Sequence, residues 1–497
     1  MNFCLNFPLF LIVLGLMSAV ISSLLPAKAA RALSTALSLA SFTANLVVLF
    51  YVRGEGANFT YMMGHYPHPW GNELKIGLIE ALFSCLLSLV MFLNLLGGRQ
   101  LVSLRVRPEK ENYYYVMADL VQTALTVLIY TNDIFTGYVF IEICTLSSCG
   151  LLMIRQTGKA ILASVRYMIF SLIGSGLFLL GVIFLYNITG HLLMPNLKES
   201  VAALWAGGSY HMPLLAAICL ICIGLAVKSG LFPFHLWMAD TYGAAVPASS
   251  GILSGLVSKA YILFLLKLIF DVFGTEVFYA CGIHQLLFAM GAAGIIIGSV
   301  GAIRENNIFR MIAYSSAAQI AYIYMGIGLS ASGGLLAAFF QVLAHAVTKP
   351  LLFLAAGQLS LSSGKAKHFH DLQGAAYRNP LAGATFTIGA LSMIGVPFTV
   401  GFISKFLFGS AAFDAVFSKQ LVTLLVLAAS TVLNTLYYAR TVIRLYNRPQ
   451  TVPQTEEGAG KQTAFLVGGT LFAAAILFLG TVSAPLIELL DAGIRLF

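Results

Sequence analysis

The feature that most constrains this chain is a series of apolar runs, which follow one another along most of its 497 residues. A run of about twenty apolar residues is long enough to cross a bilayer as a helix. The runs lack the alternation of apolar and polar residues that a transmembrane β-barrel requires. Charged residues make up only 9% of the chain, whereas soluble domains contain roughly one quarter. The sequence therefore excludes a water-soluble globular protein and predicts an all-α polytopic membrane protein.

We predict fourteen transmembrane helices, of which the seventh and the twelfth are broken. The seventh runs into Gly230 and Pro233, and the twelfth contains Gly395 and Pro397. The polar stretches between the spans are too short to bury a core of their own. The predicted spans lie near residues 4–25, 30–52, 75–97, 113–130, 134–154, 163–188, 213–230, 249–270, 277–302, 308–329, 333–362, 380–413, 419–446 and 463–490.

The basic residues predict the orientation of the spans. Eighteen of the 28 Lys and Arg residues lie in or beside loops that follow odd-numbered spans, and five lie beside loops that follow even-numbered spans. Because cytoplasmic loops carry an excess of Lys and Arg, we expect a multi-pass protein of the inner (cytoplasmic) membrane with both termini outside. No basic residue precedes the first run, whereas Lys28 and Arg31 follow it. That order is the reverse of a signal peptide, so we expect this run to be a retained span.

The sequence predicts no cofactor, no metal ion and no nucleic-acid partner. It contains no zinc-site spacing, phosphate loop or nucleotide fingerprint. Cys219 and Cys222 form a CxxC motif, but the motif lies within an apolar span and favours small buried hydrophobic side chains. The stretch HFHD at 368–371 favours a solvated loop over a metal site. The net charge of +9 follows from the membrane orientation rather than from a polyanionic partner.

Six ionisable residues deep inside the apolar runs form a candidate proton relay. A charge at the centre of a bilayer costs roughly 2.5–3.5 kcal/mol on insertion scales, so such a residue usually faces protein or water and has a function. Glu80 and Asp119 lie nearer the ends of their spans and have weaker claims. The six residues are Glu142, Lys228, Lys259, His345, Lys349 and Lys405.

The sequence around these residues supports a relay. Lys228 precedes the break at Gly230 and Pro233, where we expect it to gain freed backbone carbonyls and water as partners. Burial disfavours the charged form of a lysine and a nearby carboxylate favours it, so Lys228 can act as a switchable proton carrier. The alternatives are a Lys228 that extends to the surface and a Glu142 that merely bonds to a neighbouring helix. His345 and Lys349 are four residues apart and share one helix face beside Pro350, which favours a relay over a structural histidine.

The two broken spans also suggest an inverted repeat. Lys228 and Lys405 lie on spans that are five spans apart, and an odd offset inverts the membrane orientation. We therefore expect helices 1–3 in residues 1–112, a first five-helix repeat in 113–272, a second, inverted repeat in 273–447, and helix 14 in 448–497.

Residues 113–415 contain a series of motifs, which are Glu142, KSGLFPFHLW at 228–237, VPASSGILSGLVSK at 246–259, RMIAYSS at 310–316, HAVTKPLLF at 345–353 and GVPFTVGFISKF at 395–406. By these motifs the segment resembles the proton-conducting antiporter-like subunits of respiratory complex I, Mrp-type sodium/proton antiporters and membrane-bound hydrogenases. The resemblance implies a Glu142–Lys228 ion pair, a central relay of Lys259 and His345 with Lys349 nearby, and Lys405 as the terminal lysine. Residues 61–76 resemble the D-type Mrp subunit and its hydrogenase relatives. One departure is Gln319, which cannot titrate.

These observations predict a proton-translocating subunit of a multisubunit cation/proton antiporter. We expect other membrane subunits as partners, protons as the ion that this chain moves, and Na⁺ handled through a partner. The alternative is an antiporter-like proton-pumping subunit of a complex I-like NADH dehydrogenase or a membrane-bound hydrogenase, since the chain has no redox centre of its own. The buried charges argue against a scaffold that has lost conduction, and the lack of an evident anion or sugar site argues against a stand-alone solute carrier.

Overall fold

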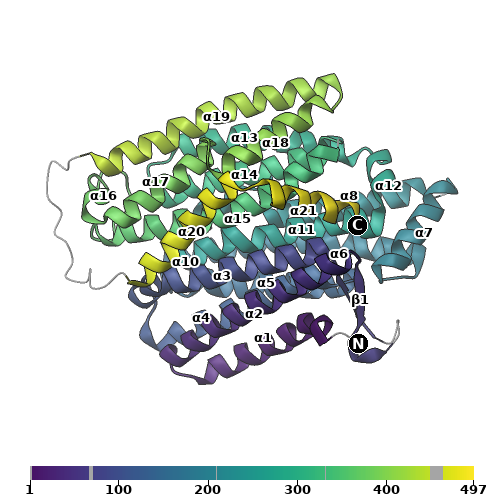
Figure 1. Cartoon of the computed structure of the whole chain (residues 1–497), viewed down its shortest axis with the longest axis horizontal. Coiled ribbons are helices and arrows are strands. Elements are labelled where there is room, and N and C mark those ends of the chain that lie inside the picture. The colour runs from purple at the N-terminus through teal and green to yellow at the C-terminus, as the bar shows by residue number, and fades with distance from the viewer. Residues whose placement is uncertain (1–2, 67–70, 209, 331, 448–462, 497) are drawn as a thin grey trace.

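The computed structural model describes residues 3–66, 71–208, 210–330, 332–447 and 463–496. Within these residues the chain forms a bundle of long helices that lie side by side (Figure 1). Eleven helices of the described part are long and apolar enough to cross a membrane on their own. The other three predicted spans are α4 (Glu111–Tyr130), α14 (Ile308–Gly328) and the pair α17 (Pro380–Ile394) and α18 (Val400–Phe413). All fourteen predicted spans are therefore helical.

The remaining elements follow the predicted order, with a few short additions. The N-terminal spans are α1 (Phe7–Leu24), α2 (Ala27–Glu55) and α3 (Leu78–Arg105). The next are α5 (Ile134–Met153), α6 (Gly158–Thr189), α8 (His211–Ser229), α9 (Leu236–Ala244), α10 (Pro247–Ile252) and α11 (Ser258–Leu268). The last are α13 (Ile283–Arg304), α15 (Ser332–Leu361), α19 (Phe417–Tyr446), α20 (Thr463–Thr481) and α21 (Ala484–Arg495). The short helices are α7 (Met194–Ala206), α12 (Thr275–Ala280) and α16 (Ala375–Arg378), and π-helical turns occupy Leu253–Val257 and Ile269–Phe273.

The stretch before α3 is a small hairpin, which the sequence reasoning missed. Strand β1 (Phe59–Met62) pairs antiparallel with β2 (Glu73–Ile76), so that Thr60 lies opposite Lys75. The helix of the third span therefore begins three residues after the predicted position near residue 75. Gly77 has extended backbone angles, and the helix begins at Leu78. The stretch 189–212, predicted as a polar connection, contains the helix α7.

The loops gather at two opposite ends of the bundle. Hydrogen bonds join loops that follow odd-numbered spans, such as that from Arg105 to the Ser360 hydroxyl (3.0 Å) and that from Arg155 to the Ala244 carbonyl (2.6 Å). We call this end the basic end. At the other end, Asn58 donates to the Leu496 carbonyl (2.7 Å). Both chain termini lie at that opposite end (Figure 1).

The two five-helix repeats run in opposite directions. Span 4 begins at the basic end with α4, whereas span 9 begins at the other end with α13, beside α12 (Figure 1). The breaks in α8–α9 and α17–α18 have the same cap. Gly230 (φ 81°) and Gly395 (φ 89°) both have left-handed backbone angles, which glycine adopts without a steric penalty. The next amide then bonds back five residues in each case, from Leu231 to Ala226 and from Val396 to Leu391 (3.0 Å each).

The most deeply buried spans carry the central lysines. The segment from α10 to residue 273 and helix α15 are almost completely enclosed by the other helices. They approach closely at Gly255, where an added Cβ atom would lie 2.4 Å from the Pro350 Cγ atom. Glycine at this position therefore allows the π-helical turn before Lys259 to pack against the part of α15 that carries His345 and Lys349.

Candidate functional site

The predicted pair of Glu142 and Lys228 is present. Lys228 lies in the last turn of α8, and its Nζ atom is 3.4 Å from Glu142 Oε1 on α5. The same ammonium donates to the Thr145 hydroxyl at 2.7 Å and lies 5.5 Å from the centre of the Tyr261 ring. The Lys228 side chain is fully buried, whereas 23% of the Glu142 side chain is exposed. Lys228 is thus held by a hydroxyl, a carboxylate and an aromatic ring.

Lys228 does not use the carbonyls that the break exposes, contrary to our expectation. In the described structure its hydrogen-bond partners are side chains of α5. Lys405 is the lysine that reaches such a carbonyl. It lies on α18, and its side chain folds back over Gly395 so that Nζ donates to the Ile394 carbonyl (2.6 Å) and to the Thr431 hydroxyl (3.0 Å). Each lysine is therefore tied to a broken span, but by different partners.

The central residues Lys259, His345 and Lys349 lie within electrostatic range of one another. Lys259 donates to the Ser254 carbonyl, which belongs to the π-helical turn, and to the Ser258 hydroxyl (3.1 Å). A π-helical turn changes the carbonyl pattern of a helix and is frequent at functional sites. His345 is completely buried, yet among the residues that the structure describes neither of its ring nitrogens has a hydrogen-bond partner. Because an unpartnered buried polar group costs about 1–3 kcal/mol, the histidine is a place where a water molecule or a shifting proton would be stabilised.

A hydrogen-bonded chain connects Lys349 with the break beside Lys405. Lys349 donates to the Ser315 hydroxyl (2.8 Å), and the Tyr437 hydroxyl contacts Ser315 (3.1 Å) and Asn434 Oδ1 (2.7 Å). The Asn434 amide donates to the Met393 carbonyl (3.1 Å), one residue before the carbonyl that Lys405 contacts. Sequence reasoning missed Ser315, Tyr437 and Asn434. The signal for Asn434 was a set of polar residues three or four apart on one face of α19, whereas Ser315 and Tyr437 lie outside that set. The set is Thr431, Asn434, Tyr438 and Thr441.

The other half of the site has a shorter connection. The Thr145 hydroxyl, which accepts from Lys228, lies 3.4 Å from the Tyr261 hydroxyl. Tyr261 follows Lys259 by two residues on α11. We call the predicted residues Glu142, Lys228, Lys259, His345, Lys349 and Lys405 the line of six. Hydroxyl groups extend from Lys228 towards α11 and from Lys349 towards the break beside Lys405.

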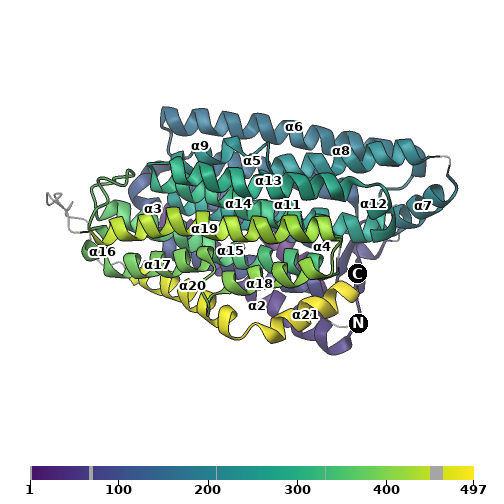
Figure 2. The same cartoon turned by 90° about the horizontal axis from the view of Figure 1, so that it is seen from above.

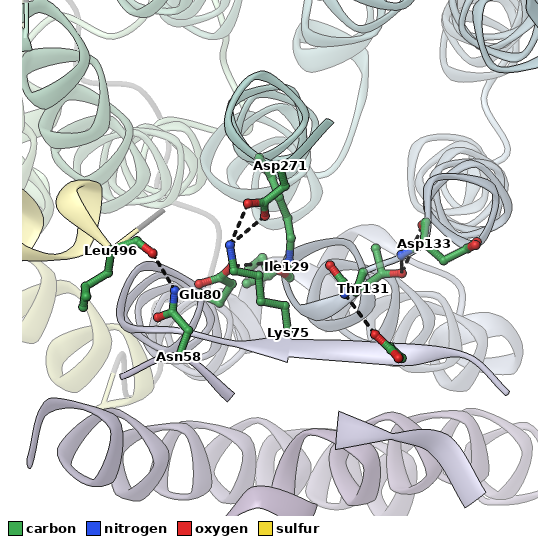
Figure 3. Close-up of polar contacts among 11 residues, drawn as sticks. Asn58, Lys75, Glu80, Ile129, Thr131, Asp133, Asp271 and Leu496 are labelled. Atoms are coloured by element: carbon green, nitrogen blue, oxygen red, sulfur yellow. Dashed lines mark hydrogen bonds and ion pairs between the residues drawn. The ribbon is translucent and has the colours of Figure 1, made fainter. Parts of the chain in front are cut away.

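Figure 3 shows a separate cluster of charged residues around Lys75, Glu80 and Asp271. Lys267 lies 3.4 Å from Glu80 and donates to the Ile129 carbonyl (2.8 Å), and both charged side chains are 3% exposed. Beside them, Lys75 of β2 contacts both carboxylate oxygens of Asp271 at 2.7 and 2.8 Å. Lys267 was overlooked in the sequence because it lies close to the end of its span. Glu80 therefore belongs to this cluster and not to the line of six.

Asp119 has a structural setting. Its Oδ2 atom accepts from the Ser18 hydroxyl (2.7 Å) and from the Ser22 hydroxyl (3.3 Å), which are both on α1. The carboxyl group thus joins α4 to α1 and lies apart from the six residues.

A bundle of two inverted repeats, with a broken helix in each and a lysine at each break, defines a membrane protein of the ion-transporter class. The family model for NADH:quinone oxidoreductase/Mrp antiporter transmembrane segments matches residues 131–434. The chain belongs to this family.

Relatives and solved structures agree with this assignment. The chain is 31% identical to the N subunit of the NADH-quinone oxidoreductase of Desulforudis audaxviator, over 89% of this chain and 86% of that protein. It is 26% identical to the D-type subunit of the Na⁺/H⁺ antiporter of Bacillus subtilis, over 82% of this chain and 81% of that protein. It also superimposes on a chain of the membrane-bound sulfane sulfur reductase, an archaeal respiratory membrane complex, with a TM-score of 0.87 and 27% identity over 98% and 97% of the two chains.

Proposed function

We propose that this chain is the proton-translocating subunit of a multisubunit cation/proton antiporter. The observation that supports this proposal most strongly is the set of three buried lysines, one half-buried lysine and one buried histidine, with hydroxyl groups beside the lysines. Each of these residues can bind and release a proton, and a hydroxyl can both donate and accept a hydrogen bond. Protons would move along Glu142, Lys228, Lys259, His345, Lys349 and Lys405, with water completing the gap at His345.

Movement of the Glu142 carboxylate relative to Lys228 would drive the first step. A nearby carboxylate stabilises the charged lysine, whereas separation in a buried site favours release of the proton. Thr145 is positioned to hold the ammonium when the carboxylate moves away. Since one pK unit corresponds to about 1.4 kcal/mol, a small rearrangement suffices to move the proton onward.

We infer that a partner subunit covers Glu142. Phe135, Val139 and Leu146 share the outer face of α5 with Glu142 and are 38–61% exposed. A carboxylate that faces lipid is costly, whereas one that faces a neighbouring subunit can be paired. The solved structure that this chain resembles is part of a membrane complex, which fits such a partner. Na⁺ would be handled through a partner subunit.

We further propose that the basic end faces the cytoplasm and that the membrane is the inner membrane. Lys and Arg accumulate in cytoplasmic loops, and both chain termini would then lie outside.

The second candidate is an antiporter-like proton-pumping subunit of a redox-driven complex. It is favoured by the 31% identity to a protein named as an NADH-quinone oxidoreductase subunit. The chain would then work with partner subunits that carry the electrons.

Proton/sodium exchange in everted vesicles separates the two candidates. The complete set of neighbouring genes would be expressed in an antiporter-deficient host, with Lys228→Ala as the test variant and Lys198→Ala, on the short helix α7, as the control. We expect sodium to drive a pH change that Lys228→Ala abolishes and Lys198→Ala preserves. Exchange that requires an added electron donor would favour the redox-driven complex, and exchange that survives Lys228→Ala would contradict the relay.

A further inference from the structure

A cavity of about 690 Å³ lies at the basic end of the bundle, away from the line of six residues. It is bounded by the beginning of α6, the end of α9 and the loop that follows α15. Within the described residues, the only acidic residue that lines it is Asp240. The basic residues that line it are Arg155, Lys159, Arg166, Arg310 and Lys367.

Asp240 neutralises only part of this charge. Its carboxylate is shared by Arg166 and by Arg310, whose Nη1 atom lies 2.5 Å away. Glu305, which does not line the cavity, also pairs with Arg310 at 2.8 Å. Arg155 donates to the Ala244 carbonyl (2.6 Å) and Lys367 donates to the Gly243 carbonyl (2.9 Å), both at the end of α9. In the described part of the chain, the ion pairs of the cavity involve neither Arg155 nor Lys367. The cavity therefore has surplus positive charge.

The surplus charge affects Lys367 directly. Burial lowers the pKa of Lys367 to about 8, and the nearby charges of Arg155, Arg105 and Lys159 contribute to this lowering. The Lys367 ammonium also lies 5.7 Å from the centre of the Phe309 ring. A bound anion would relieve the repulsion between these cations.

The beginning of α6 adds hydrogen-bond donors to the same cavity. Thr157, Gly158 and Lys159 line it, and they lie at the first turn of a helix of 32 residues. The first amide groups of a helix lack partners within the helix and favour a negative charge. Backbone donors and side-chain cations thus converge, which is a suitable environment for a phosphate group.

The cavity also borders an apolar surface. Leu162 lines the cavity and is 55% exposed. Ile161, Val165 and Ile169 of α6 are exposed as well, and α6 forms an outer edge of the bundle (Figure 2). A ligand with a phosphate in the cavity can therefore lay an apolar chain along α6.

We propose that this cavity binds a phosphate-bearing anion, and that the apolar border favours the headgroup of an anionic phospholipid over free phosphate. Basic pockets between transmembrane helices are suited to such headgroups. The proposal is independent of the transport function, because none of the residues involved belongs to the line of six.

Native mass spectrometry of the purified complex tests the proposal. The complex is titrated with phosphatidylglycerol, with phosphatidylcholine and with inorganic phosphate. We expect saturable binding of one phosphatidylglycerol that phosphatidylcholine does not compete away. Removal of one cation, in Arg155→Gln or Lys367→Gln, should weaken this binding about fivefold. The control Lys28→Gln removes an exposed cation outside the cavity and should leave the binding unchanged.

The outcomes distinguish the two sources of phosphate. Binding of inorganic phosphate that phosphatidylglycerol does not displace would support the phosphate site and assign it to a soluble anion. Equal binding of phosphatidylglycerol and phosphatidylcholine, without binding of inorganic phosphate, would overturn the proposal. So would wild-type affinity in both cavity variants. The comparison of the three ligands uses the wild-type complex, so it tests the proposed phosphate site even if a variant does not assemble.

Discussion

The Lys228 ammonium lies closer to the Thr145 hydroxyl (2.7 Å) than to the Glu142 carboxylate (3.4 Å). The Thr145 hydroxyl is therefore a second hydrogen-bond partner of Lys228 on α5, three residues after Glu142. Because the hydroxyl also lies 3.4 Å from Tyr261 on α11, it connects the ion pair with the helix that carries Lys259.

This relationship predicts that Thr145→Val impairs exchange. The substitution keeps the shape of the side chain and removes a hydrogen bond to a charged group, which is worth about 1.5–3 kcal/mol. We expect exchange in everted vesicles to fall roughly tenfold or more. Thr145→Ser keeps the hydroxyl and should retain most of the activity. Equal activity in the Val and Ser variants would show that the hydroxyl is dispensable.

The chain between Lys349 and Lys405 predicts a second transport defect. Tyr437→Phe removes the hydroxyl that contacts Ser315 and Asn434 but leaves the ring in place. We expect the rate of exchange to fall while the amount of protein in the membrane stays constant. Tyr377→Phe is the control, since Tyr377 is 61% exposed and lies apart from the chain. Normal exchange in Tyr437→Phe would exclude this route.

The buried pair of Glu80 and Lys267 predicts a defect of stability. Glu80→Gln leaves the Lys267 charge buried without its carboxylate, and breaking such a pair typically costs about 3–5 kcal/mol. We expect a lower unfolding temperature for the purified protein. The double variant Glu80→Gln/Lys267→Met removes both charges and should recover part of the loss. A double variant that is less stable than Glu80→Gln would argue against this explanation.

The Lys367 environment predicts that lipid binding depends on pH. Because the pKa of Lys367 is lowered to about 8, the side chain is charged at pH 7 and largely neutral at pH 9. Arg155, Arg105 and Lys159 face it, and the Gly243 carbonyl accepts its hydrogen bond. The affinity for phosphatidylglycerol should therefore fall as the pH rises, by about fivefold for the loss of one cation. Titrations at pH 7 and 9 measure this change, and Lys367→Gln should show a flatter pH dependence.

The spans and the six ionisable residues within them could be predicted from the sequence because both depend on residue type. Apolar runs of membrane length and charges inside them are visible without a structure. The outer ends of the spans were harder to predict, as at β2, because a short hairpin at a membrane boundary has no strong periodicity. The partners of Lys405 could not be predicted either. They depend on the chain reversing at Gly395, which brings a side chain back to the carbonyl of Ile394, eleven residues earlier.

The hydroxyl groups beside the lysines could not be predicted from the sequence either. Ser315 and Tyr437 are 122 residues apart in the chain, and polar residues of these types are common in membrane helices that merely pack together. Only the packing of α14 against α19 shows that they meet beside Lys349. Similarly, the basic residues near α6 predicted the orientation of the spans in the membrane. That they line one cavity could not be predicted, because it depends on how three separate loops pack together.

The central claim is that Lys228 carries a proton and not merely a positive charge. Comparison of Lys228→Arg with the wild type in the vesicle exchange assay tests it most directly, because arginine keeps the charge but does not release its proton. The account predicts that Lys228→Arg is as inactive as Lys228→Ala while both proteins are present in the membrane at normal levels. Exchange at the wild-type rate in Lys228→Arg would contradict it and would leave Lys228 with an electrostatic role alone.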